Sequence, residues 1–200
     1  MRVLMTGGGT AGHINPALAI AAKIEQENPD AEILFVGAKG RMETTLVPQA
    51  GYAIRTVDVR GFQRRLSVKN VGRNLSAAVH AVTAGRESTR ILREFRPDIA
   101  IGTGGYVCGP VLRKAAQMGI PVVVHESNAY PGMTVKMLAK HATVLLADEA
   151  ARRYLPPETK VVVTGNPIRA DFLRLDKQQA RRELGLDDRP LILSFGGSLG

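Results

Sequence analysis

The stretch MRVLMTGGGTAGH at residues 1–13 decides the fold, because a short apolar run meets a glycine loop and then a helical pattern. A strand, a glycine loop and a helix in succession commonly bind phosphate groups in α/β proteins. N–H groups of the loop and of the first helical turn favour an anion, and glycine lets the backbone approach it closely. We therefore expect this loop to bind a diphosphate.

Strand-like and helix-like segments alternate along the rest of the chain. This alternation predicts an α/β fold with a Rossmann-like, doubly wound parallel sheet covered by helices. We expect strands near residues 2–6, 32–36, 52–57, 98–101, 121–124, 143–146, 160–163 and 190–195, and helices near 14–27, 41–49, 67–95, 109–118, 131–140, 147–153 and 176–184.

The last predicted strand runs into a second glycine loop, GGSLG at residues 196–200, where the sequence ends. One strand cannot bury its own apolar faces, so we expect the N-terminal piece of a longer, two-domain protein. Turn residues near 164–167 mark the expected boundary. Residues 1–164 would form a Rossmann-like acceptor-binding domain, and residues 165–200 a linker and the first strand of a truncated donor-binding domain.

Composition restricts the class of protein and its partners. The single cysteine, Cys108, excludes a disulfide framework and fits a reducing compartment. We see no signal peptide, and no apolar run approaches the roughly 18 residues that span a bilayer. The net charge of +9 is concentrated in residues 60–96, which hold nine Arg or Lys against two acids. With only 4% aromatic residues, this basic patch favours an anionic membrane surface over nucleic acid.

The spacing Gly7-x-Gly9-x-x-Gly12 also satisfies the dinucleotide fingerprint. A nicotinamide or flavin site further requires an acid at the end of the second strand, but that strand runs into VGAK at residues 36–39. The missing acid disfavours a dinucleotide, which stays open together with a glycine turn that binds nothing. No Asp-x-Asp motif or metal-ligand cluster is visible in the sequence, so we expect neither a cofactor nor a metal.

Two further loops are expected beside the first. GTGGYVCGP at residues 102–110 follows the fourth strand, and HESN at residues 125–128 follows the fifth. Ligands of a doubly wound sheet bind beyond the carboxyl ends of the strands, where the strand order reverses between the first and fourth. Each polar residue could instead be a capping or surface group, but their convergence on one edge favours a site. The predicted crevice holds His13, Tyr106, His125, Glu126 and Asn128.

Five motifs occur in the order found in a known family: GGTAGH at residues 8–13, GGYVCGP at 104–110, HESN at 125–128, GNPIR at 165–169 and GGS at 196–198. Together with RME at 41–43 and LVP at 46–48, they resemble the bacterial GT-B glycosyltransferases that complete the lipid-linked peptidoglycan precursor. The resemblance covers essentially the whole chain. Ala11 stands where many members have glycine, and Ser127 where many have glutamine.

The resemblance implies an inverting transfer of N-acetylglucosamine from UDP-N-acetylglucosamine (UDP-GlcNAc) to the C4 hydroxyl of undecaprenyl-diphospho-N-acetylmuramoyl-pentapeptide. The N-terminal domain of this family takes the lipid-linked acceptor, and the C-terminal domain takes most of the UDP-sugar. The 200-residue chain alone is therefore expected to be inactive. Two alternatives stay open: a related glycosyltransferase that acts on diacylglycerol, and a non-catalytic, membrane-associated binding module.

Individual roles follow from the resemblance and from elementary chemistry. A sugar hydroxyl needs a general base, and an imidazole exchanges protons near neutral pH. His13 is the first candidate for this base, with Glu126 or His125 as rivals. By resemblance, contacts with UDP-GlcNAc are expected from Thr10, Ala11, Gly12, Asn128, Arg169 and Ser198. Contacts with the acceptor diphosphate are expected from Gly8, Gly9, Gly104, Gly105 and Tyr106.

The basic segment is predicted to form a membrane-facing helix over residues 67–95. At about 100° per residue, one face is an apolar stripe that ends in arginines, and the opposite, small and apolar face packs on the sheet. Such an outer face suits anionic lipid and predicts a peripheral enzyme on the cytoplasmic face of the bacterial membrane. Alternatively, the helix breaks at Gly72 or Gly85 and the stripe lies in the core. The expected membrane face comprises Leu75, Val79, Val82, Arg86, Arg90 and Arg93.

Overall fold

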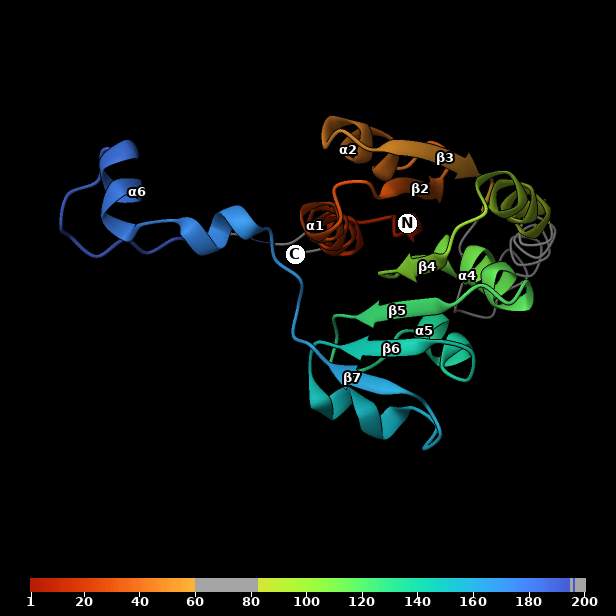
Figure 1. Cartoon of the computed structure of the whole chain (residues 1–200). Coiled ribbons are helices and arrows are strands. Elements are labelled where there is room, and N and C mark those ends of the chain that lie inside the picture. The colour runs from red at the N-terminus through yellow and green to blue at the C-terminus, as the bar shows by residue number, and fades with distance from the viewer. Residues whose placement is uncertain (60–82, 195, 197–200) are drawn as a thin grey trace, which may run out of the picture.

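The computed structural model describes residues 1–59, 83–194 and 196 of the chain. Within this part, seven parallel strands form one sheet in the order β3-β2-β1-β4-β5-β6-β7 (Figure 1). The order reverses between β1 and β4, as the sequence predicts for a doubly wound fold. The strands are β1 (Arg2–Thr6), β2 (Glu32–Ala38), β3 (Ala53–Val57), β4 (Ile99–Gly102), β5 (Val122–Glu126), β6 (Thr143–Leu146) and β7 (Val161–Val163).

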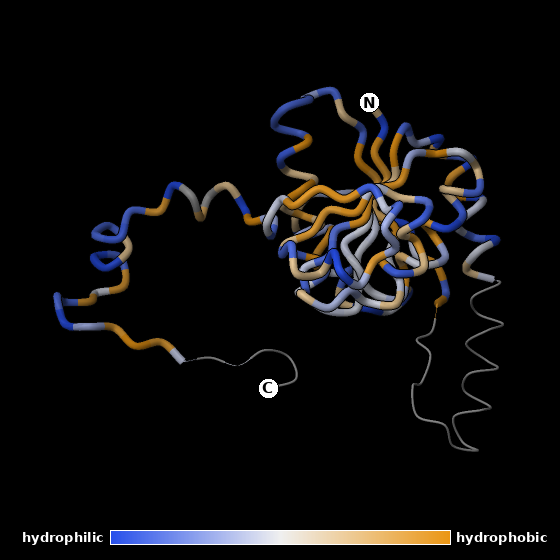
Figure 2. Tube along the Cα trace, turned by 90° about the horizontal axis from the view of Figure 1, so that it is seen from below, coloured by the Kyte–Doolittle hydropathy of each residue, from blue (hydrophilic) through white to orange (hydrophobic). Residues whose placement is uncertain are grey.

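Helices cover both faces of the sheet (Figure 1). Successive residues of β1 point to opposite faces, so Val3 and Met5 join one apolar cluster and Leu4 joins the other. Figure 2 shows the resulting apolar interior. The first cluster is covered by α1 (Ala11–Glu27) and α2 (Glu43–Gln49), and the second by the helix over residues 83–95, α4 (Cys108–Gln117), α5 (Met133–Leu138) and the 3₁₀ helix η1 (Glu149–Tyr154).

Helix α1 packs closely on the sheet because its buried face is mostly small. Ile14, Ala17 and Ala21 recur at helical spacing and are fully buried in one cluster with Phe35. Thr10 lies in extended conformation at the N-cap, so the helix begins at Ala11, three residues earlier than predicted. Thr10 is therefore the N-cap, and the two residues after it form the first turn of α1, at the carboxyl edge of the sheet.

The helix over residues 83–95 has the phase that the sequence predicts. Ala84, Ile91 and Leu92 are buried, and the helix continues through Gly85 rather than breaking there. Arg86, Arg90 and Arg93 are exposed. The remaining members of the expected membrane face, Leu75, Val79 and Val82, lie outside the described residues.

The chain leaves the sheet after β7. The 3₁₀ helix η2 (Ala170–Arg174) and helix α6 (Lys177–Glu183) stand apart from the sheet in both views (Figures 1 and 2). The strand predicted at 190–195 is wrong for residues 190–194, which form no strand; Ile192 is 90% exposed. A strand needs a neighbour for its backbone groups, and no strand of the sheet lies beside this segment. The domain boundary near residue 164 stays a prediction.

Among the described residues, no helix has the length and apolar character needed to cross a membrane.

Candidate functional site

The loops that follow β1 and β4 pack against each other at the carboxyl edge of the sheet. The N–H of Gly8 donates a hydrogen bond of 3.3 Å to the carbonyl of Gly104. Gly105 has a φ of +89°, and a Cβ there would overlap the Gly8 carbonyl. This close backbone contact needs glycine, and it confirms the prediction that the two loops are neighbours.

His13 lies in the first turn of α1 and is held by Thr103. Its Nδ1 is 3.0 Å from the Thr103 carbonyl, and the Thr103 hydroxyl donates to the His13 carbonyl at 2.6 Å. A carbonyl oxygen only accepts, so Nδ1 carries the proton and the neutral ring keeps Nε2 as an acceptor. Gly104 has a φ of +112°, and a Cβ there would overlap the His13 ring. The tautomer that a general base requires is therefore built into the loop.

Glu43, the acid of the RME motif, is not among the residues that the sequence predicts for the site. This carboxylate is the first residue of α2 and is fully buried. Oε2 accepts from the N–H of Gly9 and Oε1 from the N–H of Ala38, each at 2.9 Å. No acid ends β2, but Glu43 follows the end of that strand by five residues and binds the backbone of the glycine loop. No local signal in the sequence indicates these contacts, because an acid at a helix start is ordinary and the two donors lie outside α2.

These contacts bear on the expectation that Gly8 and Gly9 contact the acceptor diphosphate, which stays a prediction. In this structure both groups are used internally, by the Gly104 carbonyl and by Glu43. The next N–H groups, those of Ala11 and Gly12, lie in the first turn of a 17-residue helix and have no intrahelical partner. Both residues are exposed. The start of α1 is therefore where the loop offers open donors to an anion.

His125 differs from His13 because its ring is enclosed. It is 1% exposed, its Nε2 is 3.2 Å from the Gly165 carbonyl, and the Ser127 hydroxyl is 3.4 Å from its Nδ1. The carbonyl fixes Nε2 as the donor, which leaves Nδ1 to accept from the hydroxyl. Burial lowers the pKa of His125 and so favours the neutral ring. With both nitrogens engaged, His125 is a poor general base.

Glu126 is also occupied by the fold. Its carboxylate is 4% exposed and accepts from the backbone and side-chain amides of Asn128 at 2.9 and 2.7 Å, and from the N–H of Gly132 at 2.7 Å. Gly132 is the N-cap of α5, so Glu126 orders the whole loop between β5 and α5. These donors disfavour Glu126 as a base. They also orient Asn128, whose side-chain oxygen stays an acceptor.

The other predicted contacts are spread along the same edge and beyond it. Tyr106, next to Gly105, is 65% exposed. Arg169 is exposed on the segment that leaves the sheet, with its guanidinium 4.8 Å from the centre of the Phe172 ring. Ser198 lies outside the described residues. The structure thus brings His13, Gly104 and Gly105 together but leaves the predicted donor-side residue Arg169 on a separate segment.

Cys108 lies under the loop without reactive character. Its thiol contacts the Gly104 carbonyl at 2.9 Å, and burial raises its pKa to about 11. A thiol that stays protonated is a weak nucleophile. In the part of the chain that the structure describes, no group of three or more His, Cys, Asp or Glu is arranged to hold a metal ion.

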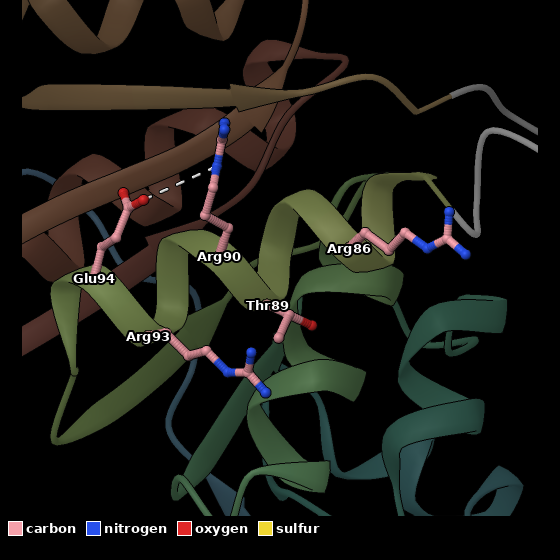
Figure 3. Close-up of a pocket in the computed structure, with 5 residues that line it drawn as sticks. All are labelled: Arg86, Thr89, Arg90, Arg93 and Glu94. Carbon is pink, nitrogen blue, oxygen red and sulfur yellow. Dashed lines mark ion pairs between the residues drawn. The ribbon is translucent and has the colours of Figure 1, made fainter.

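A surface pocket lies away from the glycine loops, on the outer face of the helix over residues 83–95 (Figure 3). Glu94 pairs with Arg55 at 3.0 Å and approaches Arg90 at 4.0 Å. Among the described residues, no carboxylate lies within 4 Å of Arg86 or Arg93. The helix therefore presents positive charge to the outside. The pocket is lined by Arg86, Thr89, Arg90, Arg93 and Glu94.

Known proteins resemble this chain in sequence and in fold. Residues 3–146 match the family model described as the glycosyltransferase family 28 N-terminal domain. The chain is 47% identical over its whole length to a UDP-N-acetylglucosamine–N-acetylmuramyl-(pentapeptide) pyrophosphoryl-undecaprenol N-acetylglucosamine transferase of Acetivibrio thermocellus, and 46% identical to the protein of that name from Clostridioides difficile. It covers 54% and 49% of these two proteins, so the chain spans about half the length of the curated relatives it matches.

Solved structures with the same fold include a crystal structure of Acinetobacter baumannii MurG. The TM-score is 0.68 at 30% identity, over 85% of this chain and 47% of that one. A UDP-GlcNAc 2-epimerase from Neisseria meningitidis, bound to UDP-GlcNAc, matches with a TM-score of 0.60 at 16% identity, over 94% of this chain and 55% of that one. The second likeness concerns the fold alone.

Proposed function

Because this chain belongs to glycosyltransferase family 28, we propose that it forms the acceptor-binding half of a peptidoglycan precursor glycosyltransferase. The enzyme transfers N-acetylglucosamine from UDP-GlcNAc to the C4 hydroxyl of undecaprenyl-diphospho-N-acetylmuramoyl-pentapeptide. The names of the relatives favour this acceptor over diacylglycerol, and favour an enzyme over a non-catalytic module. The observation that carries the proposal is the open Nε2 of His13 beside two glycine loops.

In the proposed mechanism, Nε2 of His13 takes the proton of the acceptor hydroxyl. The hydroxyl oxygen forms a bond to the anomeric carbon of the donor sugar from one face, while the bond from that carbon to the UDP oxygen breaks on the other. The configuration at the anomeric carbon is therefore inverted, and UDP leaves with the bonding electron pair. Thr103 stabilises the imidazolium formed, because its carbonyl accepts a hydrogen bond from the Nδ1–H group.

Substrate binding is proposed at the same edge. The open N–H groups of Ala11 and Gly12, with the positive end of the α1 dipole, suit a phosphate of UDP-GlcNAc, and the Thr10 N-cap lies beside them. Asn128 offers an amide oxygen to a sugar hydroxyl. Tyr106 offers an exposed ring to the acceptor. Arg169 pairs with the donor diphosphate once the second half of the enzyme is in place, and Ser198 belongs to the same donor side.

The test is His13→Ala in the intact protein, assayed with a soluble acceptor analogue and UDP-GlcNAc. Loss of a general base lowers kcat by ~10²–10⁴, and KM for the donor stays close to the wild-type value. His141→Ala is the matched control, because His141 is an exposed histidine beyond α5. A kcat within about tenfold of wild type would contradict the role of His13.

We also propose that the helix over residues 83–95 contacts the anionic cytoplasmic face of the bacterial membrane, since the acceptor lipid stays in the bilayer. The exposed Arg86, Arg90 and Arg93 on this helix support it (Figure 3). Each arginine near such a surface contributes about 1 kcal/mol, so replacing all three by Glu lowers vesicle affinity by at least ~10². Vesicles containing anionic lipid measure this in a sedimentation assay, with neutral vesicles as control. Unchanged binding would contradict the proposal.

A further inference from the structure

Glu43 is a buried ionisable group for which the proposed mechanism has no use. Its side chain is fully buried, and within the described residues no Lys, Arg or His nitrogen lies within 4 Å of it. An unpaired charge in such a place is costly unless hydrogen bonds replace its water. Two backbone N–H groups do so here, from Gly9 and Ala38, each at 2.9 Å. The carboxylate thus connects the glycine loop after β1 with the end of β2.

The contact with Gly9 lies one residue before the N-cap of α1. Gly9 has a φ of +84°, and the next residue, Thr10, is the N-cap whose carbonyl accepts from the N–H of His13 at 3.1 Å. A Cβ on Gly8 would overlap the Glu43 carboxylate, so the loop lies directly against it. The loop backbone is therefore clamped on one side by Glu43.

The other side of the same loop rests on the segment after β4. Gly8 donates to the Gly104 carbonyl, and Gly104 also lies against the His13 ring that Thr103 orients. A shift of Gly8 and Gly9 away from Glu43 would move the start of α1 relative to Thr103. The position of His13 Nε2 thus depends on Glu43 through two backbone connections.

We propose that Glu43 is the resident anion of the glycine loop and a positioning residue for His13. It fixes the turn at Gly9, holds the His13 base in place in the first turn of α1, and keeps substrate phosphate away from the Gly9 N–H by charge repulsion. This inference rests on the proposed transferase function. In this inference the N–H of Gly9 binds Glu43, and the N–H groups at the start of α1 are available to the substrate.

The experiment is a double-mutant cycle in the intact protein with Glu43→Gln and His13→Ala. The amide has the same volume but one oxygen acceptor, and its NH₂ group would face one of the two N–H donors. Misplacing the base by about an ångström lowers kcat ~10²-fold. In the His13→Ala background there is no base to misplace, so the same substitution lowers kcat by less than about threefold. A structural role alone would lower kcat equally in both backgrounds.

Glu87→Gln is the matched control. Glu87 is a partly buried carboxylate that accepts the backbone N–H of Asp58 at 2.8 Å, away from the glycine loop. We expect Glu87→Gln to leave kcat unchanged, both alone and in the His13→Ala background. Thermal unfolding of each variant shows whether it folds. If Glu43→Gln does not, Glu43→Asp enters the same cycle, because it keeps the charge but is too short for both donors.

Equal losses in the two backgrounds, or a wild-type kcat for Glu43→Gln, would overturn the inference. A different result tests the proposed function itself: if His13→Ala alone retains activity, His13 is not the base, whatever Glu43 does. Activity that depends on His13 but not on Glu43 leaves the transferase proposal standing and removes only the positioning role.

Discussion

His13, in the first turn of α1, and His125, near the carboxyl end of β5, lie at the same edge of the sheet, yet their surroundings give them opposite properties. His13 donates a hydrogen bond from Nδ1 to the Thr103 carbonyl and keeps Nε2 as an open acceptor. His125 is enclosed, with one nitrogen at the Gly165 carbonyl and the other at Ser127. This contrast supports our proposal that the carboxyl end of β1 serves catalysis, whereas the carboxyl end of β5 holds its loop together. The two residues are of the same type, so their different properties come from the hydrogen-bond partners of each ring.

The sharpest test of this comparison is Gly104→Ala. The new Cβ would occupy the space of the His13 ring, at a backbone φ of +112° that L side chains rarely adopt. We expect kcat to fall ~10²-fold because the ring must move, with a smaller loss of stability. Gly119→Ala is the control, since Gly119 also has a positive φ, of +75°, but open space around it. An equal loss of kcat in both variants would contradict the assignment.

A second prediction concerns the β5 edge, where we expect a loss of stability instead. Glu126→Gln replaces a carboxylate that accepts three N–H groups by an amide with one acceptor oxygen. The free energy of unfolding should fall by about 1–3 kcal/mol, as for other buried groups left unsatisfied. Denaturant unfolding measures this, and kcat should fall far less than in His13→Ala. A Glu126→Gln protein that is stable but inactive would contradict this prediction and would indicate a catalytic role for the loop after β5.

The smallest expected effect is a pH dependence from His125. Burial lowers its pKa in the folded state, so the unfolded state binds the proton more readily. The stabilisation is fully present above the ordinary histidine range, near pH 6.5, and is lost as pH falls below it towards the folded-state pKa. Unfolding free energies measured between pH 7 and 5 should decrease, and His125→Asn should reduce this slope. A slope unchanged by the substitution would show that His125 titrates alike in both states.

The sequence predicts much of this fold because its signals are local. Apolar runs such as ILFV at residues 33–36 define strands, and their alternation with helical segments defines a parallel sheet. The order of such a sheet then brings the loops after β1 and β4 together, as found at Gly8 and Gly104. The phase of the helix over residues 83–95 follows from periodicity in the same way.

The remaining features depend on partners that are distant in the sequence. Nothing near His125 indicates that the carbonyl of Gly165, forty residues away, occupies its ring. Likewise, Glu43 is an ordinary acid at a helix start in the sequence, and only the fold brings its carboxylate to the N–H of Gly9. Residues 190–194 have the composition of a strand, but composition cannot supply the neighbouring strand that pairing requires. The sequence therefore predicts which loops are neighbours better than it predicts the partners of the residues within them.

The hydrogen bond between His125 and Gly165 also determines where the outlying segment is anchored. Gly165 follows β7 and has a φ of +76°, and its carbonyl is held by a buried ring in the sheet. The segment that carries η2 and α6 therefore departs from a fixed pivot. In a lever of this kind, a small rotation at the pivot displaces the far end in proportion to its distance. A single buried imidazole thus holds the carbonyl at which the chain turns away from the sheet.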